Sequence, residues 1–445
     1  MGTANDYNYV RVSRLEPLSI ESLALVVAGL YFLYLVYKKQ ANWDIAYFLC
    51  LPFTDDPFRI GSLQPVEVLS LFLIAFNYRK LRLNYVILIG CTFILFSGIG
   101  FLTGNVHGAY SPLYSIRFLL IGLVFSVFKN QPFRLPVSVM RFVIVFSFAM
   151  TFLQAALWLA GLPVHGIFYN GVLPRTKGLA HEPATWSIWI VTLFPFILHF
   201  KLGRTYLVLN FLMLVLTFST FGTLATLTFF GIRWVLSGAH FRLRKSALRF
   251  AAVALVLALG IVVVKPDTLD SAAKLLTVFN KLVLYQQEIT KIATGQSGDV
   301  VSGQPESGRS GDLTYLENTF PDHWLVGVGS FNSPYDPGDP NFIPGTNVYL
   351  TMPAELGVTG MALIFFLFLM HYRVLLRNQR QKSVDFIAYS LNFLLMIAGI
   401  RCFSFYEPWY AQATLLRLPR ESEAEVITNP SATPWGSAAP PPAET

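Results

Sequence analysis

Long runs of apolar residues fill most of the chain and are separated by short polar loops. Each run has about 17 to 25 residues, the length that an α-helix needs to cross the hydrocarbon core of a bilayer. Two apolar pieces, 43–53 and 405–418, are too short or too interrupted to assign. The pattern predicts an all-α, polytopic transmembrane bundle of about 11 to 12 spans. The predicted spans are 19–37, 62–78, 84–103, 112–128, 137–161, 183–201, 204–219, 221–238, 248–264, 346–371 and 384–405.

A long polar stretch, residues 265–345, interrupts this series of apolar runs. Within it, apolar residues from Leu269 to Val283 recur every three or four positions, which is typical of an amphipathic helix. Such a helix lies either on the membrane or against its own loop. The chain therefore divides into an N-terminal bundle, a large loop, C-terminal spans and a Pro- and Ala-rich tail that we expect to be disordered. Their bounds are 1–264, 265–345, 346–418 and 419–445.

Basic residues cluster in short loops, and the positive-inside rule places these loops in the cytoplasm. The clusters are Arg79–Arg82, Lys129 with Arg134, Lys201 with Arg204, Arg242–Lys245 and Arg373–Lys382. The loops 163–182 and 265–345 then face the opposite side, and the amino terminus lies inside. Lys38 and Lys39 fit this scheme only if the piece 43–53 crosses or re-enters the membrane.

The composition supports an integral membrane protein. Hydrophobic residues make up 54% of the 445 positions and charged residues 13%, whereas soluble domains carry about twice that share of charge. The net charge of +8 comes from the basic loops, so it does not indicate a nucleic-acid partner. The cysteines Cys50, Cys91 and Cys402 show neither metal-ligand spacing nor a disulfide pattern, and we expect no metal site and no cofactor.

Two polar clusters stand beside predicted spans. The first contains Arg175, Lys177, His181 and Glu182, directly before Pro183, a residue that favours the first turn of a helix. The second begins at Arg309 and continues through His323 and Asn347 to Glu355. Because a guanidinium stays charged and binds phosphate oxygens through two hydrogen bonds, the arginines of these clusters suit a diphosphate ligand. Arg117 and Arg401 lie inside apolar runs, where an ionisable residue is either functional or packed against helix carbonyls.

In these clusters the chain resembles the O-antigen polymerase and ligase superfamily of bacterial envelope glycosyltransferases. Gly178–Ala184 is similar to a Gly-Leu-Phe-x-Glu-Pro-Ser element of many polysaccharide polymerases. Further matching pieces are Pro321–Gly329, which ends in Gly-Val-Gly, Asn347–Leu350 at the start of a span, and Glu355–Gly360. The resemblance covers residues 165–370, and the preceding residues match only in being transmembrane.

The chain departs from the family pattern at two places. Thr346 stands where the ligase branch usually has His before the Asn of the span, which argues against ligase activity. The run Ser219–Gly222 lacks the Ser-Arg pair that is common after this span, so one expected arginine is missing.

The resemblance implies an enzyme of the bacterial inner membrane with a fold like that of metal-independent C-type glycosyltransferases. Such an enzyme transfers a growing glycan from undecaprenyl diphosphate to another lipid-linked repeat unit on the periplasmic side, and so builds O-antigen or exopolysaccharide. Its partners would be the lipid-linked donor and acceptor, the bilayer, and a flippase and chain-length regulator. The reaction needs cations at the departing diphosphate and an acceptor for the proton of the attacking hydroxyl.

Each candidate residue has a role in this scheme and a plainer alternative. Arg175 and Arg309 are expected to bind the diphosphate and Glu182 to activate the acceptor hydroxyl, with substrate contacts from Lys177, His181, His323, Asn347 and Glu355. In the plainer alternatives, the first-cluster cations pair with lipid headgroups, Glu182 complements a helix dipole, and Arg309 and His323 are surface residues. Asn347 then caps a helix and Glu355 pairs with a neighbouring helix.

Two other functions are open on the sequence alone. One is a ligase of the same superfamily, which moves the finished glycan to a different acceptor. The other is a transporter of lipid-linked oligosaccharide, for which internal repeats and broken helices with midplane charges would be typical. We find no convincing repeat, and the charges concentrate in the loops.

Overall fold

The computed structural model describes most of the predicted bundle. The described residues are 20–54, 58, 63–105, 110–160, 167–169, 174–180, 183–237, 316, 319–331, 348–377, 383–399 and 405–418. The predicted span 248–264, the amphipathic helix 269–283 and the tail from 419 onward lie outside these residues, as does most of the large loop.

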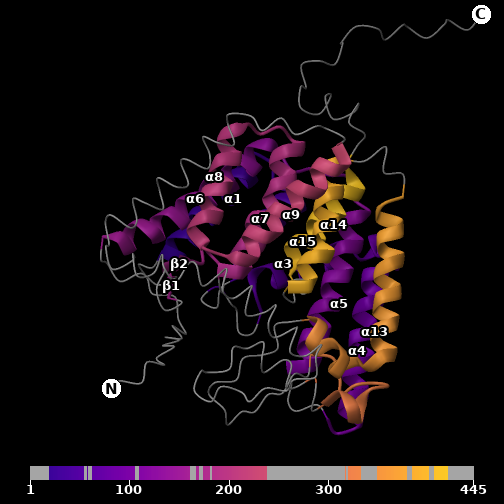
Figure 1. Cartoon of the computed structure of the whole chain (residues 1–445). Coiled ribbons are helices and arrows are strands. Elements are labelled where there is room, and N and C mark those ends of the chain that lie inside the picture. Colours follow the sequence, from indigo (N-terminus) through magenta and orange to yellow (C-terminus); the bar gives the residue numbers. More distant parts are fainter. Residues whose placement is uncertain are drawn as a thin grey trace, which may run out of the picture.

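The chain folds into a bundle of helices (Figure 1). A two-stranded antiparallel hairpin, in which Phe168 pairs with Arg175, adds a small element that the sequence did not predict. The first half contains α1 (Ile20–Tyr37), α2 (Trp43–Cys50), α3 (Pro65–Phe76), the 3₁₀ turn η2 (Tyr78–Lys80), α4 (Tyr85–Leu102), α5 (Tyr110–Lys129) and α6 (Val137–Leu159). The second half contains β1 (Ile167–Tyr169), β2 (Pro174–Thr176), α7 (Pro183–His199), α8 (Arg204–Thr217), α9 (Thr220–Ser237), α13 (Val348–Leu375), α14 (Val384–Gly399) and α15 (Tyr406–Arg417).

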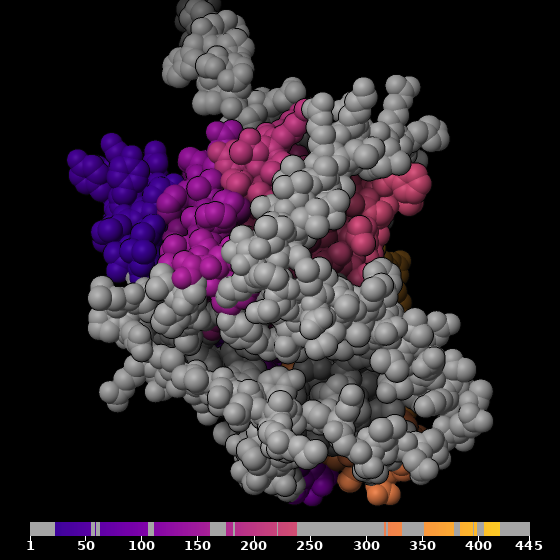
Figure 2. All heavy atoms as spheres, turned by 60° about the vertical axis from the view of Figure 1, so that its left-hand side comes forward, coloured from indigo at the N-terminus to yellow at the C-terminus, as the bar shows by residue number. Residues whose placement is uncertain are grey.

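Four of the described helices, α4, α5, α6 and α13, are long and apolar enough to cross a membrane, and six further apolar helices are shorter. The outer faces of the bundle expose large apolar side chains, as on α1, which stands at the edge of the molecule (Figure 2), and along α13. Lipid tails, unlike water, solvate such faces without penalty. The prediction of a helical membrane protein is thus confirmed at this level.

Helix α15 occupies the centre of the bundle (Figure 1). Every side chain from Tyr406 to Leu415 is buried, and the Trp409 ring packs edge-on against the rings of Phe118 and Phe393. This helix corresponds to the piece 405–418 that the sequence left unassigned. Its length falls short of a full span, yet it forms the core on which the longer helices pack.

Three of the basic loops meet at one end of the bundle, which we call the basic end. The Asn130 side-chain amide donates to the carbonyl of Lys80, and the rings of Phe133 and Phe200 stack at 5.4 Å. These contacts join the loops that carry Arg79–Arg82, Lys129 with Arg134, and Lys201 with Arg204. The shared location agrees with the assignment of these loops to one side of a membrane.

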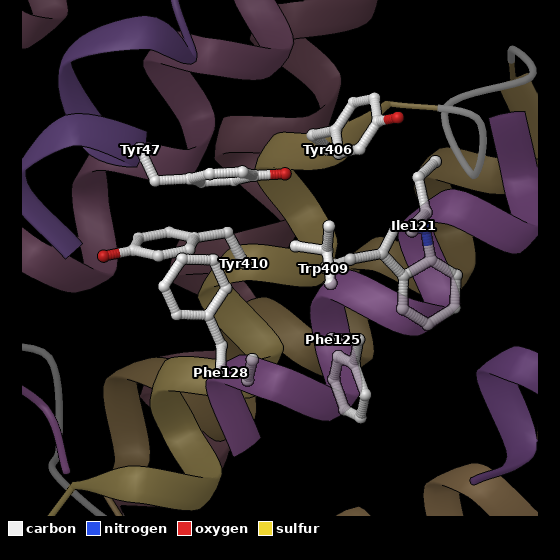
Figure 3. Close-up of a pocket in the computed structure, with 9 residues that line it drawn as sticks. Tyr47, Ile121, Phe125, Phe128, Tyr406, Trp409 and Tyr410 are labelled. Atoms are coloured by element: carbon white, nitrogen blue, oxygen red, sulfur yellow. The ribbon is translucent and has the colours of Figure 1, made fainter. Parts of the chain in front are cut away.

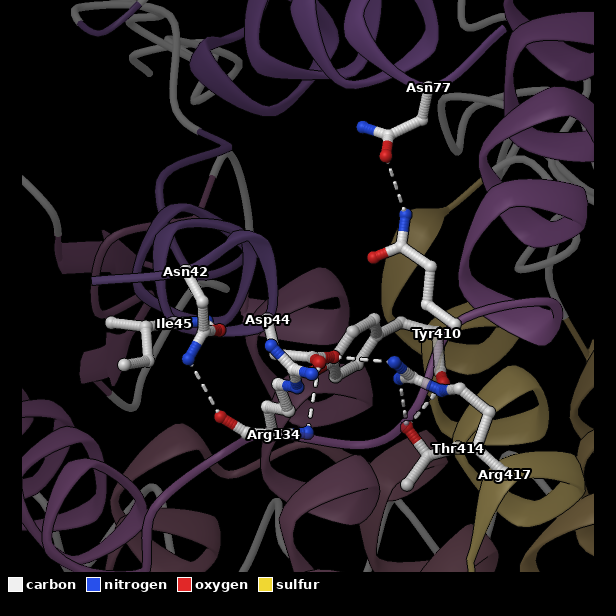
Figure 4. Close-up of polar contacts among 9 residues, drawn as sticks. Asn42, Asp44, Ile45, Asn77, Arg134, Tyr410, Thr414 and Arg417 are labelled. Atoms are coloured by element: carbon white, nitrogen blue, oxygen red, sulfur yellow. Dashed lines mark hydrogen bonds and ion pairs between the residues drawn. The ribbon is translucent and has the colours of Figure 1, made fainter. Parts of the chain in front are cut away.

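A buried ion pair holds α2 and α15 together at the basic end (Figure 4). Asp44 lies 2.6 Å from Arg417 and accepts hydrogen bonds from the Tyr410 hydroxyl at 3.0 Å and from the backbone N–H of Arg134 at 3.1 Å. The Arg417 guanidinium also stacks over the ring of Phe128. Because each charge has a partner and hydrogen bonds, the cost of burying it is offset.

The piece 43–54 runs from the basic end to the opposite end. The Asn42 side chain donates to the Arg134 carbonyl, and the Thr54 N–H donates to the Leu179 carbonyl. Lys38 and Lys39 therefore lie at the basic end, which removes the conflict noted in the sequence. Helix α1 then begins at the opposite end, and the residues before Ile20, with the predicted location of the amino terminus, lie outside the described residues.

Candidate functional site

Residues 174–180, which we call the Arg175 segment, are held inside the bundle by Gln154 of α6. The Gln154 side chain is fully buried; its amide nitrogen donates to the Gly178 carbonyl at 2.8 Å, and its oxygen accepts from the Gly178 N–H at 3.0 Å. Gly178 has φ +56°, and an added Cβ would lie 2.0 Å from the Trp186 ring. Only glycine fits at this position.

Arg175 and Thr176 lie beside the carboxyl end of α8. The Arg175 Nε donates to the Thr217 carbonyl at 3.3 Å, and the Thr176 hydroxyl donates to the Leu216 carbonyl at 2.8 Å. These carbonyls belong to the last turn of α8, where the backbone lacks helical partners and the helix dipole favours cations. The Lys177 side chain is only 6% exposed, so it is not a headgroup-facing surface lysine.

A second segment, residues 323–331, which we call the GVG segment, fills a break in α13. The helix is interrupted at Gly357, whose φ and ψ are 60° and −174°. The backbone N–H groups of Val328 and Gly329 donate to the carbonyls of Ala354 and Glu355 at 3.0 and 2.9 Å. On the other side of the break, the N–H of Val358 donates to the Trp324 carbonyl at 2.8 Å. The GVG segment thus satisfies backbone groups that the break would leave unpaired in a membrane-length helix.

Two glycines permit this close approach of one backbone to another. Gly327 has φ +72°, and an added Cβ would lie 2.3 Å from the Glu355 carbonyl oxygen. Gly357 has φ +60°, and an added Cβ would lie 2.5 Å from the backbone of Leu325 and Val326. The two glycines belong to the pieces Pro321–Gly329 and Glu355–Gly360 that carry the family resemblance, and the structure brings these pieces into direct contact.

Side chains fasten the end of the GVG segment between α4, α5 and α13. The Ser330 hydroxyl donates to the Phe93 carbonyl and lies 3.0 Å from the Ser115 hydroxyl. The Glu355 carboxylate, 2% exposed, accepts a hydrogen bond from the Phe331 N–H at 2.9 Å. Glu355 thus contacts the backbone of the GVG segment, and its predicted role in substrate binding stays a prediction.

Both segments lie at the end of the bundle opposite the basic end, which we call the loop end. Helix α7 ends next to Phe200 at the basic end, so it begins, just after the Arg175 segment, at the loop end. The GVG segment binds the middle of α4 and the first turns of α5, a helix that begins at the loop end (Figure 1).

The remaining predicted site residues are distributed as follows. His323 is half-buried at the start of the GVG segment, and its carbonyl accepts from the Gly327 N–H at 2.7 Å. The adjacent Trp324 is 54% exposed. His181, Glu182, Arg309 and Asn347 lie outside the described residues, so their roles stay predictions from the sequence.

Two polar features at the loop end were not assigned a role from the sequence. One is Gln154. The signal available in the sequence was its polar side chain in the middle of an apolar run. The other is the buried ion pair of Glu67 on α3 with Arg117 on α5, whose Oε1 and Nε atoms are 2.8 Å apart. The position of Arg117 in an apolar run predicted a residue that is either functional or packed against helix carbonyls, but it did not identify Glu67 as the partner.

An aromatic pocket under α15 does not offer a substrate site. Its lining comes from α2, α5 and α15 and includes Tyr47, Phe125, Tyr406 and Trp409 (Figure 3). The space between these rings has no room for a water molecule, so the residues form packed core. Among the described residues, no three His, Cys, Asp or Glu side chains come together as a metal site would require.

The loop end therefore combines a buried lysine, an arginine fixed at a helix end, and two backbone segments held in place by glycines. Such an arrangement suits the binding of an anionic group next to the bundle, because its cations are fixed before a ligand arrives. No protein-family model matches the chain, and no curated protein matches it at a significant level.

Proposed function

We propose that the protein is a glycosyltransferase that polymerises undecaprenyl-diphosphate-linked oligosaccharide repeat units, as a multi-pass protein of the bacterial inner membrane. The observation that carries the proposal is the shared location of the Arg175 segment and the GVG segment. Both contain pieces that resemble polysaccharide polymerases, and both lie at the end opposite the basic end. By the positive-inside rule this end faces the periplasm.

The residues at the loop end match what such a reaction requires. Cleavage of the donor leaves a diphosphate, whose developing charge is stabilised by cations that are already in place. Arg175 and Lys177 supply two such cations, and Arg309 is the proposed third. Glu182, one residue before the first turn of α7, is the proposed group that orients the acceptor hydroxyl and accepts its proton. The polyprenyl chains of donor and acceptor lie in the bilayer beside the apolar outer faces.

The break in α13 favours a second candidate, a transporter of lipid-linked oligosaccharide, because broken helices are typical of transporter binding sites. In transporters the freed backbone groups line the substrate cavity. Here the N–H and C=O groups on both sides of Gly357 are hydrogen-bonded to the GVG segment. This difference makes the enzyme the better interpretation, with the ligase of the same superfamily as its nearest variant.

The test uses the purified full chain in lipid nanodiscs, supplied with the lipid-linked repeat unit of its own host. We expect products of more than one repeat on a gel, and about a hundredfold lower rate for Arg175→Ala, because one charged contact to the departing group contributes roughly 2 to 4 kcal/mol. Arg175→Lys should restore little, since an ammonium cannot replace a guanidinium fork.

Arg204→Ala is the matched control, because Arg204 is an exposed arginine at the basic end. Its rate should equal that of the wild type. Full-length products from Arg175→Ala at normal protein abundance would remove Arg175 from the site. Movement of a fluorescent lipid-linked oligosaccharide across vesicles, without any chain extension, would establish the transporter instead.

A further inference from the structure

The Glu67–Arg117 ion pair lies between the two segments of the loop end. The carboxylate is 2% exposed and the guanidinium 13%, so the pair is buried within the bundle. Glu67 sits in the first turn of α3, and Arg117 lies two turns into α5. Neither residue belongs to the pieces that resemble polymerases.

Hydrogen bonds connect Glu67 to the Arg175 segment. The second carboxylate oxygen of Glu67 accepts from the Gln64 N–H at 2.7 Å, and the Gln64 side chain donates to the Thr54 carbonyl at 3.3 Å. The Thr54 N–H in turn donates to the Leu179 carbonyl at 3.2 Å. Each of these groups is held by the next, so the Arg175 segment is tied to the position of Glu67.

Aromatic packing connects Arg117 to the GVG segment. The guanidinium lies over the Tyr114 ring at 5.0 Å, and the Tyr114 ring is 5.7 Å from the Phe331 ring. The backbone N–H of Phe331 donates to the Glu355 carboxylate beside the break in α13. The ion pair is thus the point at which the supports of the two segments meet.

We propose that Glu67 and Arg117 act as a pair of positioning residues that fixes the Arg175 segment relative to the GVG segment. Burying two charges gives little net stability, whereas removing one partner leaves an uncompensated buried charge. A buried pair at this place therefore makes any shift of one segment relative to the other costly, because such a shift would separate the two charges. The contacts alone support the positioning role of the two residues. Its effect on glycan synthesis rests on the proposed function.

A second ion pair provides a matched control. Arg233 on α9 pairs with Asp385 on α14, towards the basic end, and its side chains are 36% and 12% exposed. The hydrogen bond and ion pair between Arg233 and Asp385 reach neither segment. It has the same chemistry in a different part of the molecule.

The experiment is hydrogen exchange, read by mass spectrometry, on the full chain in nanodiscs. In Glu67→Gln and Arg117→Gln, we expect exchange about tenfold faster at the amides of Thr54, Gly178 and Phe331, because the local free energy of opening falls. Arg117→Lys should lie between these variants and the wild type. Arg233→Gln should leave these three amides unchanged. Peptides from α9 and α14 should change only in Arg233→Gln.

Unchanged exchange at the three amides in both Gln variants, or equally faster exchange throughout the molecule, would overturn the proposal. If the Gln variants do not accumulate, Arg117→Lys and Glu67→Asp give the same comparison with smaller shifts. The polymer assay separates this proposal from the proposed function. A wild type that makes no polymer but shows the expected exchange pattern would keep the positioning pair and reject the polymerase.

Discussion

The Arg175 segment and the GVG segment lie at the same end of the bundle but are held by different kinds of contact. Side chains hold the first, through Gln154 and the hydroxyl of Thr176. Backbone groups hold most of the second, across the break at Gly357, and side chains fasten only its end, at Ser330 and Phe331. The first segment therefore depends on specific side chains in addition to Gly178, whereas the second depends mainly on the close backbone contact that Gly327 and Gly357 allow. The following changes test this difference, beginning with the largest effect.

Gly357→Val should be the most damaging change. The new side chain would overlap the backbone of Leu325 and Val326, at a φ of +60° that valine avoids. We expect a loss of stability on the order of 3 kcal/mol or more, seen as a lower unfolding temperature and lower yield of monodisperse protein. Gly231→Val is the control, because an added Cβ there meets no atom within 4 Å. Equal stability of the two variants would show that the break in α13 does not need glycine.

Gln154→Leu should have an intermediate effect that is confined to the Arg175 segment. It leaves the N–H and C=O of Gly178 buried without their partner, at a cost of roughly 2 to 4 kcal/mol. Faster hydrogen exchange at Gly178, with unchanged exchange at Val358, would show that the two segments are supported separately. Gln131→Leu serves as control, since it removes one partly buried hydrogen bond to Asn77 at the basic end. Exchange that rises equally at Val358 would contradict separate support.

Two threonine substitutions should give the smallest effects and the most direct comparison. Thr176→Val removes the single hydrogen bond from its hydroxyl to the Leu216 carbonyl, and should cost about 1 kcal/mol. Thr359→Val should cost less than about 0.5 kcal/mol, because the Thr359 N–H still donates to the same Leu325 carbonyl as the hydroxyl. Denaturant titrations of both variants measure the difference. A larger loss for Thr359→Val would mean that side chains, not backbone, hold the GVG segment.

The sequence predicted the membrane-length helices well because a continuous apolar run constrains a helix directly. The run 84–103 became α4 (Tyr85–Leu102), and the run 137–161 became α6 (Val137–Leu159). Short pieces were harder. Residues 405–418 form the buried helix α15, but their mixture of Tyr, Trp, Glu and Gln lowers the hydropathy below that of a span. Burial among other helices, which hydropathy does not report, decides its structure.

The break in α13 lay inside a run that the sequence predicted as one continuous span, 346–371. Apolar content says nothing about the φ of one residue, so the interruption was invisible to it. Pro353, Glu355 and Gly357 within the run were the available signals. The resemblance did identify the pieces on both sides of the contact. It did not pair them, because pairing depends on how residues far apart in the chain meet in space.

The candidate site could be predicted only in part for the same reason. Arg175 and Lys177 were named from their residue types; Arg175 does lie beside a helix end at the loop end, and Lys177 is buried there. The partners that fix them, Gln154 and the last turn of α8, are far away in the sequence. Charge and hydrogen-bonding type are properties of one residue, whereas position is a property of the fold.

The central place of α15 has a consequence for how the protein is made. A ribosome synthesises Asp44 early and Arg417 only after the other described helices have emerged, 373 residues later. Until then the carboxylate of Asp44 and the aromatic surface around Tyr47 have no partner from α15. The helices synthesised earlier therefore form an incomplete shell until α15 enters its centre. A nascent chain that stops before α15 would remain open at its centre and become a substrate for membrane proteases.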